Sequence, residues 1–166
     1  MFVNRTFCIE KNCRIRSSWS KVSYTGDFVL DSIINELKTV MDEKGISFEY
    51  SGILHLRENI VIFDICSLLY NSLMNAIEGC ERLECENKSI FMEVETNRRD
   101  GRIRIHIFNT CIFDEDICYI HSLNSSKYDG NIHGIGMQNM REIAGKYNGY
   151  IKFFVESGWF HMKVVI

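Results

Sequence analysis

Residues 64–80 read DICSLLYNSLMNAIEGC, and this stretch carries two stripes of side chains at helical spacing. Polar residues follow one side, at Asn71, Asn75, Glu78 and Arg82. The other side is apolar and consists of Ile65, Leu68, Leu69, Leu73, Ala76, Ile77, Cys80 and Leu83. The spacing predicts a helix that begins at about Asp64, a good N-cap, and packs its apolar stripe on a sheet.

The residues before this helix predict one more helix and two strands. Apolar residues at helical spacing follow a cap at Asp27 and continue until Gly45. Residues 46–50 alternate between apolar and polar, as a strand does, and the apolar run 60–63 is a second strand candidate.

The residues after it predict a hairpin, a long loop and a third helix. Residues 90–94 and 103–107 alternate on either side of a turn at 99–101. Residues 110–133 have no sustained period and are long for a connection, so we expect a lid there. A helix from about Gly136 to Asn148, stopped by Gly149, precedes two strands that are joined at 156–158.

This order of elements predicts an α+β fold. Strands in adjacent pairs with helices between them favour a two-layer α/β sandwich. Its sheet should be mixed and mostly antiparallel, with about three helices on one face. We assign residues 25–166 to this domain and expect residues 1–24 to be a linker remnant or an extra strand.

Composition limits the class of protein. The chain has 166 residues and a net charge of −3, so it has no general attraction to nucleic acid or to an anionic membrane surface. No apolar run is long enough to cross a bilayer, and we expect a cytoplasmic location and no membrane contact by this segment. The seven cysteines are an odd number without a C-x-x-C pair, and reduced thiols are expected.

Three polar features are candidates for ligand binding. Asn71 and Asn75 lie one helical turn apart, and their amide oxygens suit Mg²⁺, although any surface helix has a polar face. His133, Gly134 and Gly136 stand where the third helix starts, where bare backbone N–H groups bind phosphate, although many such glycine pairs are only turns. Asn109 ends a strand and offers the donor and acceptor that adenine needs, or it merely starts a turn.

The order of these features resembles a known family. An Asn-x-x-x-Asn-Ala helix, a strand ending in an amide, a lid and a Gly-x-Gly helix start resemble the N-box and the two G-boxes of GHKL (Bergerat-fold) ATPases. The resemblance covers roughly residues 25–166. Residues 64–80, with HGIGMQNMREI at 133–143 and KYNG at 146–149, look like the AgrC-type sensor histidine kinases of peptide quorum sensing.

The resemblance implies Mg²⁺ and ATP as ligands. Asn71 and Asn75 would lie at the Mg²⁺–triphosphate, and Gly134 and Gly136 would form the phosphate loop, with His133 beside it. Asn109 would face adenine, although this chain lacks the usual Asp-x-Gly-x-Gly, a departure that AgrC-type members share. Glu78 stands where many kinases have a basic residue, and we expect Lys127 in the lid to supply a cation instead.

The implied function is transfer of the γ-phosphoryl group of ATP to a histidine on a separate dimerisation helix, with a response regulator downstream. The five histidines of the chain, His55, His106, His121, His133 and His161, lie on no convincing helix, so we interpret all of them as non-acceptors. The chain is then a fragment, from the cytosolic part of a membrane-bound sensor. Two alternatives are a non-catalytic nucleotide-binding module, or pseudokinase, and an anti-sigma-type serine kinase on the same fold.

Overall fold

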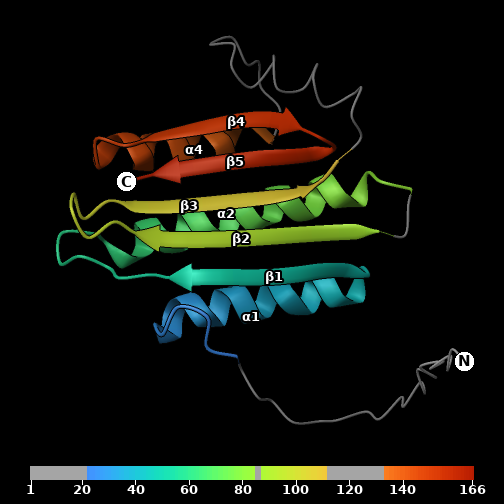
Figure 1. The fold of residues 1–166 in the computed structure, drawn as a ribbon, viewed down its shortest axis with the longest axis horizontal. Helices are drawn as coiled ribbons and strands as arrows, with labels where there is room; N and C mark the ends of the chain where they lie inside the picture. The colour runs from blue at the N-terminus through green and yellow to red at the C-terminus, as the bar shows by residue number, and fades with distance from the viewer. Residues whose placement is uncertain (1–21, 85–86, 112–132) are drawn as a thin grey trace, which may run out of the picture.

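The computed structural model describes residues 22–84, 87–111 and 133–166. In chain order the elements are α1 (Phe28–Glu43), β1 (Ile46–Ile53), α2 (Ile62–Glu81), β2 (Lys88–Thr96), β3 (Ile103–Thr110), α4 (His133–Lys146), β4 (Tyr150–Glu156) and β5 (Trp159–Val165) (Figure 1). None of these helices is long and apolar enough to span a membrane.

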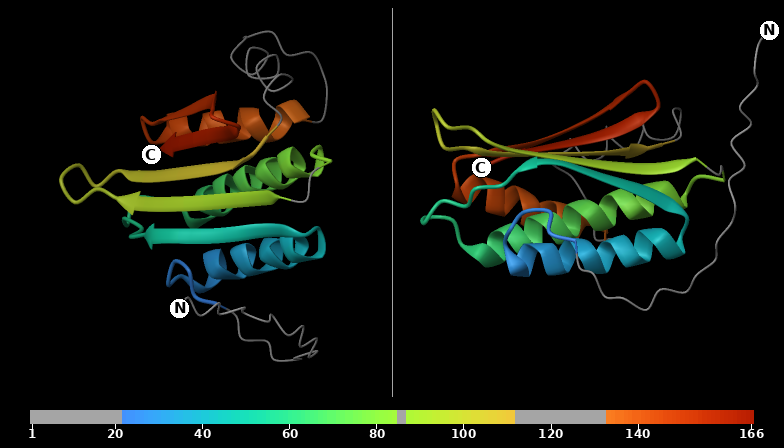
Figure 2. Two further views of the ribbon diagram at one scale, coloured as in Figure 1. Left: turned by 45° about the vertical axis from the view of Figure 1, so that its right-hand side comes forward. Right: turned by 60° about the horizontal axis from the view of Figure 1, so that its bottom comes forward.

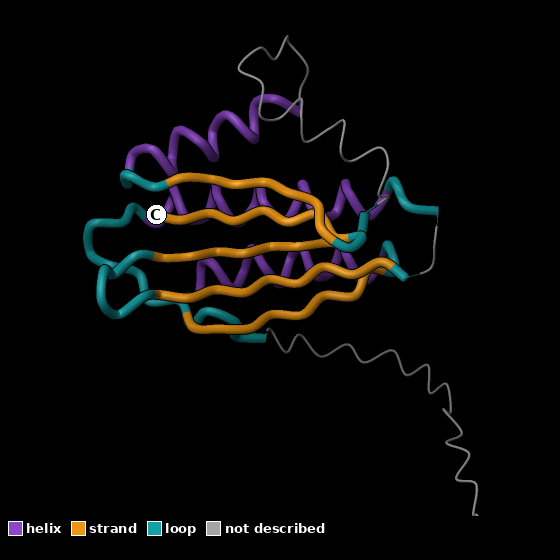
Figure 3. Tube along the Cα trace, turned by 45° about the horizontal axis from the view of Figure 1, so that its top comes forward, coloured by secondary structure: helices purple, strands orange, loops and turns teal. Residues whose placement is uncertain are grey.

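The strands form one sheet and the helices form a second layer on one of its faces. The sheet has five strands in the order β1-β2-β3-β5-β4. Among the described strands only the β1–β2 pair is parallel; the β2–β3, β3–β5 and β4–β5 pairs are antiparallel. Figures 2 and 3 show α1, α2 and α4 together on one side of the sheet. The predicted α+β sandwich, with its mixed and mostly antiparallel sheet, is confirmed.

The first helix begins and ends where its sequence predicts. The Asp27 side chain accepts hydrogen bonds from the backbone N–H groups of Val29 and Leu30, as an N-cap does. Gly45 follows the helix with a φ of 68°, a left-handed conformation that favours glycine. Inside the helix, Asp31 accepts hydrogen bonds from the residues just before it, Ser23, Tyr24 and Thr25, and so attaches them to α1.

The strand predicted at residues 60–63 is wrong, because α2 begins at Ile62 and Val61 is its N-cap. A short apolar run has no periodicity of its own, so it fits a buried strand or the first turn of a buried helix equally well. Only one strand therefore separates α1 from α2. Asp64, predicted as the cap, lies in the first turn, and the N-cap makes no side-chain hydrogen bond.

The third predicted helix starts earlier than expected, at His133 instead of Gly136. Its apolar period begins only at Met137, so the sequence pattern misses the first turn. The helix ends at Lys146, and Asn148 takes the left-handed conformation, with a φ of 52°. Gly149 is needed for another reason: a Cβ there would lie 1.8 Å from the Val165 carbonyl oxygen of β5.

The core lies between the sheet and the helices. Leu83, just beyond the end of α2, is buried, and so are the seven residues of the apolar stripe that lie on the helix, as predicted. They pack against inward residues of β2 and β3, among them Ile90, Met92, Ile105 and Ile107. On the hairpin, Arg104 and His106 alternate outward, as the sequence pattern requires.

We predict that Leu69→Ala lowers the free energy of unfolding by about 2–5 kcal/mol, because Leu69 is fully buried and truncation leaves a cavity. Urea denaturation of the two proteins measures the difference. The matched control is Tyr70→Ala on the next residue, which is 48% exposed and should cost much less. Equal losses in the two variants would mean that the faces of α2 are assigned wrongly.

Candidate functional site

A small cleft lies between α2 and α4, on the helical side of the sheet. Its volume is about 170 Å³, and its lining residues are Asn71, Met74, Asn75, Glu78, Gly136, Met137 and Met140. The two asparagines and the glycine are residues that the sequence selected separately, and the fold brings them together. The cleft is smaller than the roughly 300–1,000 Å³ of typical small-molecule pockets, so its size suits part of a ligand such as a phosphate group.

Asn71 is oriented by its own helix. Its side-chain nitrogen donates to the Ser67 carbonyl oxygen at 2.7 Å and lies 3.2 Å from the Ser67 hydroxyl. These contacts direct the amide oxygen toward α4, where a Cβ on Gly136 would lie only 2.9 Å from it. A side chain at Gly136 would therefore displace the Asn71 amide, and glycine lets the backbone of α4 approach this polar group.

Asn75 and Glu78 continue the polar stripe along the cleft. Both side chains are half-buried. Within the described residues the Asn75 amide makes no hydrogen bond, so its oxygen and nitrogen are both available to a ligand. An amide oxygen is a hard, neutral donor of the kind that Mg²⁺ accepts. The Glu78 carboxylate adds negative charge to the same cleft.

A polar cluster holds α2 and α4 together at the C-terminal end of α4, away from the cleft. The Asp64 carboxylate accepts hydrogen bonds from Lys146, at 2.6 Å, and from the Tyr147 hydroxyl. That hydroxyl also accepts the backbone N–H of Val61, the N-cap of α2, at 3.0 Å. The start of α2 is thus attached to the end of α4, so the helices run antiparallel and the start of α4 meets the middle of α2.

Two further contacts hold the helices together closer to the cleft. Asn139 donates to the Ser67 hydroxyl at 2.8 Å, and the buried Ser72 hydroxyl contacts the Met140 sulfur at 3.3 Å. Ser67 therefore connects Asn71, which lines the cleft, with α4. The sequence pattern gave no reason to select Ser67 or Asn139, because the pairing of α2 with α4 is a tertiary contact.

Asn109 lies next to the cleft but does not line it. Its side chain is 2% exposed and donates to the Thr110 carbonyl oxygen at 2.9 Å. A Cβ on Gly79 would lie 2.8 Å from its side-chain nitrogen. Asn109 is therefore packed against α2 one turn beyond Asn75, and Gly79 makes the space for it.

The remaining predicted site residues are described only in part. His133 and Gly134 are the first two residues of α4, so the glycines belong to its first turn. His133 is thus on a helix, contrary to the expectation that none of the histidines is. Lys127, His121 and nearly all of the predicted lid at 110–133 lie outside the described residues.

Methionines are lining residues of the cleft that the sequence pattern does not single out. Met74, Met137 and Met140 form the apolar wall of the cleft. The signal was present, because Met137 and Met140 follow the glycines at a spacing of three residues on one helical side. Such a pair is indistinguishable from ordinary core in a sequence, and both residues are indeed almost fully buried.

We predict that Asp64→Asn destabilises the protein at neutral pH and that this effect disappears in acid. Hydrogen bonds from Lys146 and Tyr147 lower the pKa of Asp64. A carboxylate whose pKa is lowered by folding stabilises the fold fully above its unfolded pKa of about 3.9, and this stability is lost as the pH falls through the folded pKa.

Urea titrations at a series of pH values measure this gap in the free energy of unfolding. Glu36→Gln, a carboxylate change on the exposed side of α1, is the control and should alter stability little at neutral pH. A gap between the parent and Asp64→Asn that stayed constant into acid would show that the carboxylate charge is irrelevant to the contact between α2 and α4.

Known structures share this fold. The catalytic domain of histidine kinase ThkA, in a nucleotide-free form, superposes with a TM-score of 0.60 at 22% identity and covers 84% of this chain and 94% of that chain. The mycobacterial sensor histidine kinase MprB has a TM-score of 0.60 at 12% identity, with 83% and 92% covered. The Acinetobacter baumannii histidine kinase AdeS has a TM-score of 0.58 at 14% identity, with 83% and 62% covered.

Sequence comparison gives the family. No curated protein matches the chain. A family model described as the GHKL domain matches residues 60–166, well over half of the chain, and this range includes α2, α4 and the cleft between them. The chain belongs to the GHKL domain family, and its fold is that of histidine kinase catalytic domains.

Proposed function

We propose that this chain is the ATP-binding catalytic domain of a sensor histidine kinase of the AgrC type. It would transfer the γ-phosphoryl group of Mg²⁺-ATP to a histidine on a separate dimerisation helix. The observation that carries the proposal is the meeting of two asparagines of α2 with the glycine-containing first turn of α4 in one cleft. The subgroup assignment rests on the sequence of residues 64–80 and 133–149.

The chemistry of the cleft fits a phosphate accompanied by a divalent cation. Gly136 lies in the N-terminal turn of α4, against the Asn71 amide, and the N–H groups and helix dipole of such a turn favour an anion. The amide oxygens of Asn71 and Asn75 are suitable ligands for Mg²⁺. Glu78 also lines this cleft.

The residues of this chain would act by positioning. Bound Mg²⁺ supplies neutralisation of the charge on phosphate oxygens, and phosphoryl transfer otherwise requires mainly an in-line arrangement. Asn71 is already oriented by Ser67, so its amide loses little freedom when a ligand binds. An acceptor imidazole is a nucleophile near pH 7, so this domain needs no strong general base.

The acceptor histidine would come from another segment. His106 and His161 lie on β3 and β5, in the layer opposite the cleft, and His55 lies in the connection after β1. His133 is the first residue of α4, on the same side as the proposed phosphate site, whereas an acceptor must approach the γ-phosphate in line from the opposite side. The proposed partners are therefore the dimerisation helix of a parent kinase and, downstream, a response regulator, with the parent anchored in a membrane and this domain in the cytoplasm.

One observation favours the pseudokinase alternative. Asn109, which would contact adenine, is almost fully buried, bonds to its neighbour Thr110 and does not line the cleft. A nucleotide that is held mainly by its phosphates could bind without transfer. The serine kinase alternative shares the fold and differs in the residue that is phosphorylated.

We predict that Asn75→Ala lowers the affinity for a non-hydrolysable ATP analogue at least about tenfold in the presence of Mg²⁺, since it removes an unpaired amide from the cleft. Calorimetric titration measures the affinity. The circular dichroism spectrum and melting temperature should be unchanged, because Asn75 lies on the polar stripe.

The matched control is Gln138→Ala, which removes an exposed amide of α4 that pairs with Glu142 outside the cleft. It should bind the analogue as the parent does. Equal affinities for the parent and the Asn75→Ala variant would show that Asn75 does not contact the nucleotide. If none of the proteins gave a detectable binding signal, the proposal of nucleotide binding would be wrong.

We also predict that the isolated chain binds ATP without phosphorylating itself on histidine, and that adding a dimerisation helix with an acceptor histidine restores labelling. The assay is incubation with γ-labelled ATP followed by acid, which removes phosphohistidine and leaves phosphoserine. Acid-labile label on the chain alone would contradict the account. ATP binding without phosphoryl transfer to a supplied helix would favour the pseudokinase alternative. Acid-stable label on a partner protein would favour the serine kinase alternative.

A further inference from the structure

The face of the sheet opposite the helices is uncovered by any described helix, and we name it the outer face (Figure 2). The strand registers arrange its side chains in rows that cross all five strands. One row is aromatic and the next is charged. Such an arrangement differs from the mixed polar surface that a solvated sheet face usually presents.

The aromatic row is continuous from β2 to β4. Phe91 stacks on Phe108 at a centroid distance of 5.0 Å, Phe108 lies 5.3 Å from His161, and His161 stacks on Phe154 at 4.6 Å. Trp159 adds edge contacts to Phe91 and Phe108. The rings are half-buried, so a flat apolar surface of rings remains in contact with solvent.

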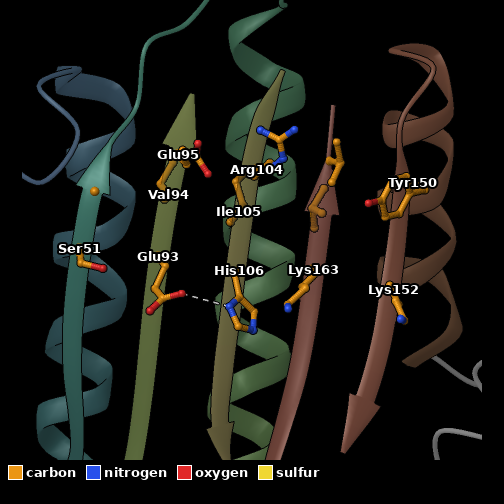
Figure 4. A pocket seen from close by; sticks show the side chains of 13 residues that line it. Ser51, Glu93, Val94, Glu95, Arg104, Ile105, His106, Tyr150, Lys152 and Lys163 are labelled. Carbon is orange, nitrogen blue, oxygen red and sulfur yellow. Dashed lines mark hydrogen bonds and ion pairs between the residues drawn. The ribbon is translucent and has the colours of Figure 1, made fainter. Parts of the chain in front are cut away.

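The charged row is polarised across the sheet. Its members pair from β1 to β4 in the order Ser51, Glu93, His106, Lys163 and Lys152. Figure 4 shows these side chains on the strands, with Glu93 bonded to His106 at 3.2 Å. They line a shallow groove of about 470 Å³. The acidic side of this face is extended by Glu49 and Glu95 on β1 and β2, while the lysines lie on β5 and β4.

This polarity is self-complementary under a two-fold rotation. The central strand of the sheet is β3, with two strands on each side. A two-fold axis that runs along β3, between two outer faces, places β2 opposite the partner's β5 and β1 opposite the partner's β4. Glu93 then faces Lys163 of the partner subunit, and the aromatic rows of the two copies meet. Closed two-fold dimers require a surface that complements itself in this way.

The remaining charged groups of the outer face are compatible with this rotation. His106, near the axis, faces its own counterpart, and partial burial lowers its pKa, which keeps the imidazole neutral near pH 7. Arg104, also on β3, likewise faces its own counterpart, and the carboxylates of Asp100 and Glu95 beside it offset the repulsion between the two guanidinium groups. Glu156 lies at the edge of the sheet on β4, where the rotation places it opposite the serine-bearing end of β1.

The size of the face predicts a weak dimer. Five strands about 4.8 Å apart, each about seven residues long at about 3.4 Å per residue, give a face of roughly 550 Å². Two such faces bury roughly 1,100 Å², close to the lower limit of about 1,000 Å² for specific interfaces. Aligned packing of two sheets, with strands within about 30° of each other, is an ordinary arrangement.

We propose that the outer face is the interface of a two-fold symmetric dimer of this chain, in which the acidic side of each sheet pairs with the basic side of its partner. The interface lies on the opposite side of the sheet from the cleft between α2 and α4. Dimerisation therefore leaves the cleft open and does not depend on the proposed nucleotide.

The test is sedimentation equilibrium over a series of loading concentrations without nucleotide. The unmodified chain should show a concentration-dependent dimer. Glu93→Lys alone and Lys163→Glu alone each create like-charge contacts across the axis and should raise the dissociation constant at least about tenfold. An equimolar mixture of these two variants should associate about as well as the unmodified chain, because each variant restores the missing charge of the other.

Two further variants keep the test decisive. Glu36→Lys makes the same charge change on α1, in the helical layer, and should leave association unchanged. Phe154→Ser removes a ring without changing charge, should also weaken the dimer, and serves if a charge variant fails to fold. A chain that stays monomeric throughout, or a mixture of the charge variants that associates no better than either alone, would overturn the proposal.

Discussion

The close approach of α4 to α2 at Gly136 and Asn71 is the constraint on which the site depends. The two helices are fixed at their far end by Asp64, Lys146 and Tyr147, and nearer the cleft by Ser67 and Asn139. With the helices held in this way, the first turn of α4 must lie against the polar stripe of α2, and only a residue without a side chain leaves the Asn71 amide in place. The cleft follows from these contacts between helices that are distant in sequence.

The sheet makes this arrangement possible because it accepts all three described helices on one face. The helix α2 lies between α1 and α4. It buries its apolar stripe against the strands, and its polar stripe faces α4. The candidate binding residues therefore lie in the helical layer. The outer face, free of described helices, carries rows of rings and charges that are set only by strand register. The two surfaces can serve different purposes because a sheet separates them.

Much of the fold could be predicted from periodicity and caps, because those signals are local. The stripe on α2, the cap at Asp27 and the hairpin around Gly101 are examples in which neighbouring residues alone decide the conformation. The prediction of a strand at 60–63 is wrong, because a run of four apolar residues fits a strand and the first turn of a helix equally well. The start of α4 was misplaced for a related reason: glycines carry no hydrophobic period.

The sequence predicts several residues of the candidate site, but it does not predict how these residues are arranged in space. Asn71, Asn75 and Gly136 were selected by residue type and spacing, but their convergence depends on the pairing of α2 with α4, which no local pattern encodes. The burial of Asn109 against Gly79 is also a tertiary contact, and it changes what Asn109 can offer a ligand. In the sequence, the methionines that line the cleft cannot be distinguished from ordinary core residues, because their position at the cleft also depends on the pairing of α2 with α4.

Binding of a metal–nucleotide complex between α2 and α4 is the step on which the proposed function rests. Nuclear magnetic resonance of the side-chain amides, with paramagnetic Mn²⁺ in place of Mg²⁺ and a non-hydrolysable ATP analogue, tests it most directly. We expect strong broadening of the Asn71 and Asn75 signals, while the signals of Asn35 on α1 and Asn97 in the β2–β3 turn remain sharp. Sharp Asn71 and Asn75 signals at saturating analogue would contradict it.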